Sequence, residues 1–248
     1  MNIETVAVEA AVQRTHWWYV GRRRLLDRLL RDLRPTPAWR ILDVGVGTGA
    51  NLPVLESLNV GRIVGCDMST TALAYSASIS RTTLIRTDAC RLPFQSDSFD
   101  ALVAMDVIEH LDADVTALQE FARVLKPGGH LIATVPAFPA LWGPQDIVAH
   151  HRRRYRRKEL LARVQHAGLQ VAADFHFNYL LFVPIWVARK LLLAFEVEVS
   201  SENQINTPLV NRLLTRIFLA DVESAPRVRL PFGVSLCLVA RNRTNPDA

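Results

Sequence analysis

Cysteine is scarce in this chain of 248 residues, which contains only Cys66, Cys90 and Cys237. Their number is odd, and no two of them form a C-x-x-C pair. Neither a disulfide framework nor a structural zinc site is therefore expected, and the thiols fit a reducing compartment.

Long hydrophobic runs are also missing. The apolar stretch at residues 179–188 has only about ten residues, which is too short to span a bilayer. Residues 1–13 contain Glu4 and Glu9 and lack a basic segment followed by an apolar one, so no signal peptide is expected. We therefore expect a cytoplasmic protein, with peripheral binding to the inner face of the membrane as an alternative.

The chain has no strong excess of charge of either sign, since its net charge is +5, but its arginines are unevenly distributed. One group lies within residues 22–34, and residues 150–158 read HHRRRYRRK. Such clusters can bind nucleic acid, an anionic membrane surface or a phosphorylated substrate, or they can form a solvated helix face. All of these interpretations stay open at this point.

Apolar runs typical of buried strands alternate with helical patterns between residues 37 and 136. Half of all residues are hydrophobic, and the length suits one large α/β domain with additions. Such alternation predicts a parallel sheet that is covered by helices on both faces. The strands are predicted at 40–45, 62–66, 83–87, 99–105 and 130–136, and the helices at 51–58, 69–78 and 112–125.

The chain is organised around residues 40–51, where an apolar strand runs into three closely spaced glycines and then into a helical pattern. Glycines at such a turn permit unusual backbone dihedrals and let a ligand approach the main chain closely. The helix that follows presents unpaired N–H groups. Gly45, Gly47 and Ala50 also satisfy the dinucleotide pattern G-x-G-x-x-G/A, so the turn alone does not specify the ligand.

Acidic residues follow three successive predicted strands. Asp43 lies at the end of the first strand, Asp67 ends the second, and Asp88 follows the third. A carboxylate at Asp43 would repel a pyrophosphate but suits a ligand that carries an amino group and a sulfonium. Asp67 comes about 20 residues after the glycines, where an acid can accept both hydroxyls of a ribose.

This pattern of glycines and acids resembles the S-adenosylmethionine (SAM) site of class I methyltransferases. Residues 98–111 (SFDALVAMDVIEHL) resemble the fourth-strand motif of that superfamily, residues 125–129 (LKPGG) resemble the turn before its fifth strand, and residues 91–94 also fit. The resemblance implies an α/β fold with a Rossmann-like sheet in the order 3-2-1-4-5-7-6. It also implies SAM as the cofactor and S-adenosylhomocysteine as the product.

The resemblance assigns cofactor-binding residues along the same stretch. Asp43 and the glycines would hold the amino-acid end of SAM, Asp67 would hold the ribose, and Asp88 would hold the adenine. Residues at the end of the fourth strand would face the methionine part of SAM. The set implied in the core is Asp43, Gly45, Gly47, Gly49, Asp67, Met68, Asp88, Ala89, Met105 and Asp106.

Residues 1–36 are predicted to form a helical cap before the core. Leucines at i, i+3 and i+4 spacing give this segment one apolar face. The aromatic group at 16–19 either anchors the helix by packing or covers the cofactor. In the second case Trp18 would line the cofactor site, and Arg22 or Arg23 would reach the carboxylate of SAM.

The core is predicted to cover residues 37–178 and to include a sixth strand at 169–177. A seventh strand falls within residues 232–248, which also contain the tail. Residues 179–231 form a helical insertion between these two strands, where class I methyltransferases usually have a short turn. The apolar segment 179–195 is either a core helix over the sheet edge, or an exposed lid for an apolar substrate or a membrane interface.

The layout as a whole also resembles a bacterial subset of these enzymes, the methyltransferases of type 11 and type 12. The shared marks are the H-x-W-x-x-x-R-R pattern that begins at His16, the H-x-R-R-Y block at 151–155 and the closing P-F-G-x-S-L. Members of this subset are mostly assigned to small-molecule, lipid-linked or glycan substrates.

A hydroxyl or amine acceptor has to lose a proton, usually to a histidine or a carboxylate. The candidates are His110, His150 and His151, although a lone histidine is more often structural. Asp106, Glu109 and His110 also resemble the E-x-x-E-H metal site of some RNA 2′-O-methyltransferases and ubiquinone-pathway O-methyltransferases, and their spacing places them on one helix face. Because the first acid is Asp and metal-free relatives carry the same E-H pair, no metal is expected.

The sequence therefore predicts a SAM-dependent methyltransferase that forms an O-methylated product from a small or lipid-linked metabolite. RNA is an alternative acceptor because of the basic clusters, but the sequence shows no RNA-binding module and no N-P-P-Y-type motif of base N-methyltransferases. A non-catalytic SAM-binding partner subunit is the second alternative. The complete set of acids and glycines argues against it.

Overall fold

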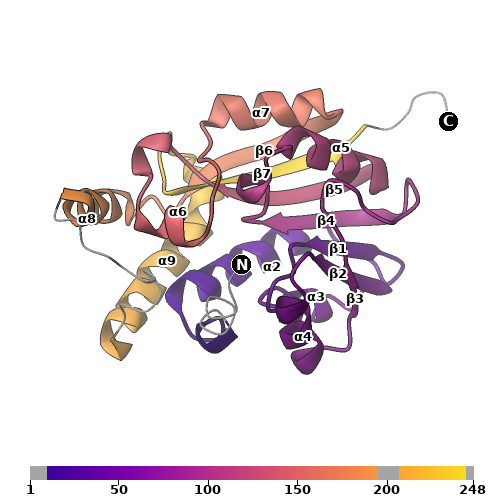
Figure 1. Cartoon of the computed structure of the whole chain (residues 1–248), viewed down its shortest axis with the longest axis horizontal. Helices are drawn as coiled ribbons and strands as arrows, with labels where there is room; N and C mark the ends of the chain where they lie inside the picture. Colours follow the sequence, from indigo (N-terminus) through magenta and orange to yellow (C-terminus); the bar gives the residue numbers. More distant parts are fainter. Residues whose placement is uncertain (1–9, 195–206, 244–248) are drawn as a thin grey trace.

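Seven strands form one sheet in the order β3-β2-β1-β4-β5-β7-β6 in the computed structural model, which describes residues 10–194 and 207–243 (Figure 1). All neighbouring strands are parallel except β7, which is antiparallel to both β5 and β6. The predicted strand order is therefore confirmed. The strands are β1 (Arg40–Val44), β2 (Arg62–Asp67), β3 (Thr83–Arg86), β4 (Phe99–Met105), β5 (Leu125–Pro136), β6 (Leu169–Phe177) and β7 (Ser235–Asn242).

Helices cover both faces of the sheet (Figure 1). α5 and α7 lie on one face, while α2, α3, α4 and α9 lie on the other. The helices are α2 (Trp17–Asp32), α3 (Leu52–Glu56), α4 (Thr70–Ile79), α5 (Asp114–Val124), α6 (Pro144–Val148), α7 (Arg157–His166), α8 (Phe182–Ala194) and α9 (Pro208–Val228).

The hydrophobic core consists of two layers because successive strand residues point to opposite faces. In β1, Ile41 faces the layer that contains Leu25 of α2, whereas Leu42 faces the layer that contains Phe121 of α5. All four of these side chains are fully buried. This explains why the strands read as continuous apolar runs rather than as alternating patterns.

The N-terminal helical cap is interrupted before the aromatic group. Among the described residues, α2 begins after His16, whose extended backbone places it at the N-cap position. The His16 ring accepts a hydrogen bond from the N–H of Trp18 at 3.3 Å. Burial lowers the pKa of His16 to about 4, so the neutral ring keeps a lone pair for this bond.

The start of β5 also differs from the prediction. The strand begins at Leu125 rather than at 130, because Leu125 pairs with Phe99 before a bulge shifts the register to Ala101 and His130. Gly128 has φ of +78°, as the expected left-handed glycine turn requires.

The insertion between β6 and β7 contains both α8 and α9, and α9 is a core element. It extends from Pro208 to Val228. Phe218 of α9 stacks on Trp18 with ring centroids 5.2 Å apart, and a Cβ at Gly21 of α2 would lie only 2.1 Å from the Phe218 ring. Gly21 therefore lets the two helices approach closely. Within the described ranges, no helix has both the length and the apolar character needed to cross a membrane.

Candidate active site

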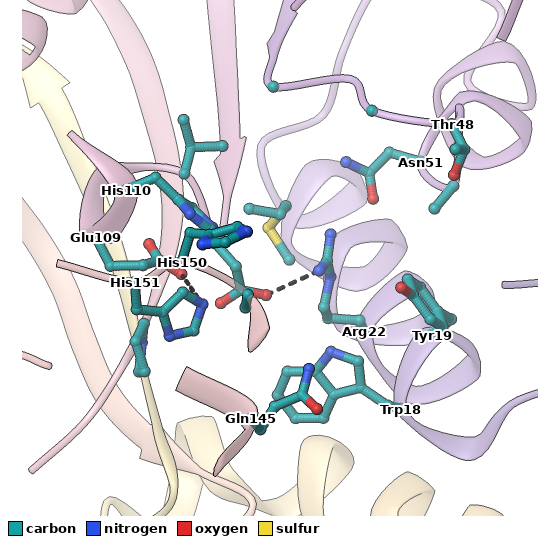
Figure 2. A pocket seen from close by; sticks show the side chains of 18 of the residues that line it. Trp18, Tyr19, Arg22, Thr48, Asn51, Glu109, His110, Gln145, His150 and His151 are labelled. Carbon is teal, nitrogen blue, oxygen red and sulfur yellow. Dashed lines mark hydrogen bonds and ion pairs between the residues drawn. The ribbon is translucent and has the colours of Figure 1, made fainter. Parts of the chain in front are cut away.

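A cavity of about 890 Å³ opens at the carboxyl ends of β1, β2 and β4 (Figure 2). This volume lies within the usual range for small-molecule sites. Its walls come from the turn after β1, from α2, from the turn after β4, and from the segment that leads through α6 to residue 154.

The glycine turn after β1 has the backbone geometry that the sequence predicts. Gly45, Gly47 and Gly49 all have positive φ values, of +69°, +54° and +85°. A Cβ at Gly45 would also lie 2.4 Å from the side chain of Val107, so a larger residue is excluded there on both grounds. The turn thus depends on glycine for its shape and for its contact with the chain after β4.

Asp67 holds the glycine turn against the end of β2. Its Oδ2 accepts a hydrogen bond from the N–H of Gly47 at 3.0 Å, and its Oδ1 accepts one from the N–H of Ser69 at 2.8 Å. Each carboxylate oxygen offers two lone pairs, so capacity remains for hydroxyl donors in the cavity. Met68, Asp88 and Ala89 line the same part of the cavity.

Asp43 and Gly49 do not belong to the residues that line the cavity. Asp43 is fully buried and accepts a hydrogen bond from the amide of Asn51 at 3.2 Å, and Asn51 does line the cavity. Burial raises the pKa of Asp43 to about 7, although Asn51 and Arg22 partly oppose this shift. Gly49 packs instead against α4, where a Cβ would lie 2.9 Å from Ile79.

Arg22 connects α2 to the end of β4. Its Nη1 lies 2.8 Å from Oδ2 of Asp106, and Oδ1 of Asp106 accepts a hydrogen bond from Thr134 at 3.1 Å. Arg22 and Trp18 line the cavity, whereas Arg23 donates to the backbone carbonyls of Gln13 and Arg14. Of the two arginines considered for this position, the structure places Arg22 on the cavity.

A second polar group, which we call the acceptor-side cluster, consists of Glu109, His110 and His151. Nε2 of His151 lies 3.8 Å from Oε1 of Glu109, and the rings of His110 and His151 are 4.7 Å apart. Burial, reinforced by the charge of Asp106, raises the pKa of Glu109 well above its usual value. Burial and the neighbouring His151 lower the pKa of His110 to about 4. His150 lines the cavity but is exposed and adopts a φ of +57°.

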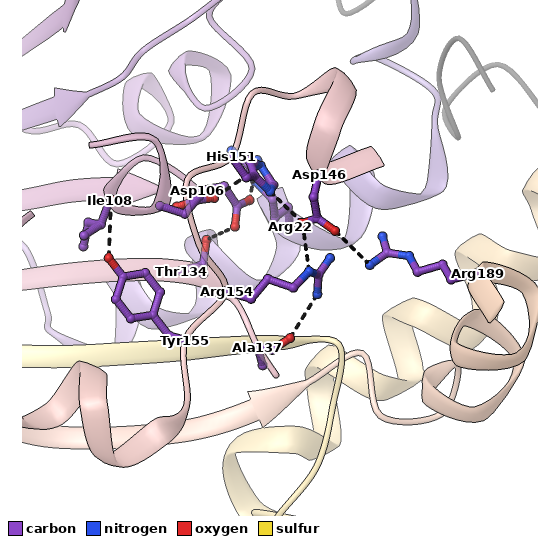
Figure 3. A network of polar contacts seen from close by, with 11 residues as sticks. Arg22, Asp106, Ile108, Thr134, Ala137, Asp146, His151, Arg154, Tyr155 and Arg189 are labelled. Atoms are coloured by element: carbon purple, nitrogen blue, oxygen red, sulfur yellow. Dashed lines mark hydrogen bonds and ion pairs between the residues drawn. The ribbon is translucent and has the colours of Figure 1, made fainter. Parts of the chain in front are cut away.

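Asp146 at the start of α6 organises the surroundings of this cluster (Figure 3). Its Oδ1 lies 2.8 Å from Nδ1 of His151 and accepts a hydrogen bond from Nε of Arg154, also at 2.8 Å. Its Oδ2 lies 3.6 Å from Nη1 of Arg189 and accepts a bond from the N–H of Gly143. These contacts lower the pKa of Asp146 to about 2 despite its burial.

Comparison with known proteins agrees with this architecture. Residues 42–133 match the family Methyltransf_11, described as a methyltransferase domain. An O-methyltransferase of Pyrenophora dematioidea is 34% identical over 119 residues, which cover 44% of this chain and 43% of that protein. A demethylmenaquinone methyltransferase of Beutenbergia cavernae is 35% identical over 128 residues, which cover 50% of this chain and 52% of that protein. The alignments thus span about half the length of these curated relatives.

Solved structures share the fold over more of the chain. A chain of the complex between the Haloferax volcanii Trm112 methyltransferase activator and a methyltransferase has a TM-score of 0.64 at 20% identity, covering 97% of this chain and 95% of that chain. Phosphoethanolamine N-methyltransferase 2 of Haemonchus contortus, solved with SAM, has a TM-score of 0.60 at 18% identity, covering 94% of this chain and 57% of that chain.

Residues 42–133 thus carry a methyltransferase domain, and the described chain shares the fold of solved methyltransferases.

Most residues that the resemblance assigns line this cavity. All three candidate histidines line it, and so do most of the assigned cofactor residues. These are Trp18, Arg22, Gly45, Gly47, Asp67, Met68, Asp88, Ala89, Met105 and Asp106. Their assigned roles stay predictions.

Other residues of the cavity and its surroundings were not predicted. Asn51 directly follows the glycine turn, at the start of the next helix. This position in the sequence could have indicated that Asn51 lies at the cavity. Gln145 and Arg189 lie far away in the sequence and line the cavity only because α6 and α8 pack together. Asp146 belongs to no local sequence motif, and only the folded chain shows that it contacts His151 and Arg154.

The basic block at residues 150–158 is largely paired with acids. Arg153 lies 3.0 Å from Asp114, and the buried Arg154 lies 2.8 Å from Asp146. Arg157 also pairs with Asp174. Of the interpretations left open for residues 150–158, a free basic surface does not hold for these three arginines, since folding brings aspartates from other elements against them.

The insertion contributes to the wall of the cavity. Ile185 and Ala188 of α8 and Leu214 of α9 line the cavity. Other apolar side chains on these helices and beside them are exposed to solvent. They are Leu180, Val183, Trp186, Val187 and Leu191 of the α8 region, and Leu209, Val210 and Leu213 of α9.

Proposed function

We propose that this protein transfers the methyl group of SAM to a hydroxyl group of a small or lipid-linked metabolite. The observation that carries the proposal is the presence of two different walls in one cavity. One wall holds the glycine turn and the carboxylates at the strand ends, and the other holds the acceptor-side cluster. A cofactor that donates a group and an acceptor that must lose a proton need this combination.

In the proposed complex, Asp67 accepts the ribose hydroxyls through the lone pairs that Gly47 and Ser69 leave unused. Asp88 and Ala89 hold the adenine. Arg22, already oriented by its bond to Asp106, binds the carboxylate of the methionine part. Asp43 does not reach the cavity itself, but it bonds to Asn51 on the cavity wall, and its charge attracts the cationic amino group of SAM.

The reaction is a displacement at the methyl carbon. A lone pair of the acceptor oxygen forms the new O–C bond while the S–C bond breaks, so S-adenosylhomocysteine leaves and the acceptor proton is released. Holding the two reactants about 3 Å apart with water excluded supplies much of the rate. We assign the activation of the acceptor hydroxyl for proton loss to the acceptor-side cluster, because its members line the cavity.

The exposed apolar side chains of α8 support an apolar or lipid-linked acceptor. Val183, Trp186 and Val187 of α8 are exposed beside Ile185 and Ala188, which line the cavity. Exposed apolar side chains around a cavity entrance often contact an apolar ligand or a membrane surface. Among the relatives, the names demethylmenaquinone methyltransferase and malonyl-[acyl-carrier protein] O-methyltransferase describe acceptors with apolar or carrier-bound character.

The two alternative functions receive less support. RNA binding would draw on the basic block, but Arg153, Arg154 and Arg157 are paired with aspartates. A non-catalytic partner subunit would not need the acceptor-side cluster. The solved complex with the Trm112 activator concerns another protein of this fold.

The proposal is tested by incubating the protein with methyl-labelled SAM and an extract of its source cells, then separating organic, aqueous and RNA fractions. We expect label in the organic fraction, with label in the aqueous fraction pointing to a polar metabolite. Asp67→Ala should abolish the labelling, and Asp32→Ala, a change at an exposed residue of α2, should preserve it. Label in RNA would support the RNA alternative. SAM binding without any label would contradict the proposed activity.

A further inference from the structure

We propose that the acceptor-side cluster binds a divalent transition-metal ion, with Glu109, His110 and His151 as its ligands. The use of this ion in catalysis rests on the proposed function, but its binding does not. The arguments are the geometry of the three side chains, the burial of Glu109 and the support that Asp146 gives to His151.

The ligand atoms of the three residues converge. One atom from each side chain can be chosen so that all lie within 4.8 Å of one another. Nε2 of His151 and Oε1 of Glu109 are 3.8 Å apart. Two ligands that are each about 2 Å from a tetrahedral ion lie roughly 3.3 Å from one another. Small side-chain movements would therefore complete the coordination.

The burial of Glu109 gives the second, independent argument. Its side chain has no exposed surface, and neither carboxylate oxygen accepts a hydrogen bond. Buried polar groups without partners are rare in folded proteins, and an ion is one of the standard explanations. A divalent ion would satisfy both oxygens and would hold the carboxylate in its charged form.

Asp146 holds His151 in the orientation that a ligand needs. Its Oδ1 lies 2.8 Å from Nδ1 of His151, so Nε2 is the nitrogen that points toward Glu109 (Figure 3). Asp146 is itself fixed by the N–H of Gly143 and by Arg154. A carboxylate on the far nitrogen of a ligating histidine is the usual support in metal sites, where it fixes the tautomer and the ring plane.

The structure selects a different ligand set from the sequence pattern Asp106, Glu109 and His110. Asp106 is bonded to Arg22 and Thr134, so it is not available without breaking an ion pair. His151 takes its place, from a segment about forty residues further along the chain, which sequence spacing could not indicate.

Two imidazoles and one carboxylate suit zinc or another first-row transition ion better than magnesium, which prefers oxygen ligands. Three protein ligands leave at least one coordination position open, and the cluster borders the cavity. An acceptor hydroxyl bound at that position would have a lowered pKa and would release its proton to water before methyl transfer.

The experiment is calorimetric titration of chelator-treated, full-length protein with Zn²⁺, and separately with Mg²⁺, in the absence of SAM. We expect one zinc ion per chain and much weaker magnesium binding. Glu109→Gln, which keeps the side-chain volume, and His151→Ala should each weaken zinc binding by at least roughly tenfold. His166→Ala is the matched control, because His166 is an exposed histidine at the end of α7.

Zinc binding that is unchanged in Glu109→Gln and His151→Ala, or absent from the folded wild-type protein, would overturn the proposal. Thermal melting of each variant shows whether it is folded, and Glu109→Gln serves if His151→Ala fails to fold. SAM binding, measured in parallel on the metal-free protein, should persist. If SAM fails to bind while zinc binds as expected, the proposed function fails and the metal site stands.

Discussion

The two walls of the cavity are built in different ways. The wall that we propose to bind SAM, which we call the cofactor wall, comes from short segments at the ends of adjacent parallel strands, and most of its groups lie within residues 44–89. We call the opposite wall, which holds the acceptor-side cluster, the acceptor wall. The acceptor wall takes its side chains from the turn after β4, from α6 and from α8, and a buried network around Asp146 holds them together.

This difference has a physical consequence for mutation. On the cofactor wall, backbone geometry sets the shape, and a side chain such as Asp67 can be changed with a local effect. On the acceptor wall, His151, Arg154 and Arg189 all contact the buried carboxylate of Asp146. Removing one partner there leaves an uncompensated charge, which is far more costly than losing an exposed contact.

The largest expected effect is therefore on stability, at the acceptor wall. Asp146→Ala leaves the buried Arg154 and Arg189 without this carboxylate and should lower the free energy of unfolding by about 3–5 kcal/mol. Urea unfolding measures the loss. Asp112→Ala, at an ion pair whose aspartate side chain is 78% exposed, should cost at most about 1 kcal/mol.

The affinity of Asp146→Ala for SAM tests whether the two walls are independent of one another. At a temperature where Asp146→Ala remains folded, its Kd for SAM should stay within about twofold of the wild-type value, since changes at independent sites have nearly additive effects. A collapse of SAM affinity in that variant would show that the two walls are not independent.

The next largest effect is on cofactor binding. Asp67→Ala removes a carboxylate whose hydrogen bonds to ribose hydroxyls should contribute about 1.5–3 kcal/mol, so the Kd for SAM should rise roughly 10- to 150-fold. Asp67→Asn keeps the volume and tests whether the charge matters. Calorimetry measures both variants against the exposed Asp32→Ala. An unchanged Kd in Asp67→Ala would refute the ribose assignment.

The sequence predicted the positions of the glycine turn and of the strand-end acids well, because these features are local. The resemblance to a known fold implied the order of the strands, and the structure confirms it. Asp43 and Gly49 are exceptions, because the sequence cannot show that folding keeps them out of the cavity wall.

The acceptor wall could not be predicted in the same way. The pattern around His110 suggested Asp106 as its companion, but Arg22 from the N-terminal helix engages that acid. The 150–158 block looked like a charged surface, yet folding buries Arg154 against Asp146. Such pairings join residues that are far apart in the chain, and composition and periodicity do not encode them.

A smaller effect is expected from pH on cofactor binding. Because burial raises the pKa of Asp43 to about 7, this carboxyl is largely protonated at pH 6 and ionised above pH 7. An ionised Asp43 favours the cationic amino group of SAM, so affinity should rise from pH 6 to 7.5, by at most about tenfold per pH unit. Asp43→Asn should flatten this profile. A flat profile in the wild-type protein would contradict the role of Asp43.

The smallest effect on the folded protein is expected at α8. Trp186→Ser on α8 alters an exposed side chain, so unfolding free energy should change by no more than about 0.5 kcal/mol, with SAM affinity unchanged. Transfer to an apolar acceptor should fall, while Tyr75→Ser, at an exposed aromatic of α4, should have no such effect. Equal transfer by both variants would remove α8 from acceptor binding.

The most direct test of the two-wall account is a crystal structure of the protein with S-adenosylhomocysteine. We predict that the ribose hydroxyls bond to Asp67 and that the sulfur faces Glu109, His110 and His151 across a space able to hold the acceptor. A ligand that binds elsewhere, or whose sulfur points away from these three residues, would contradict the account.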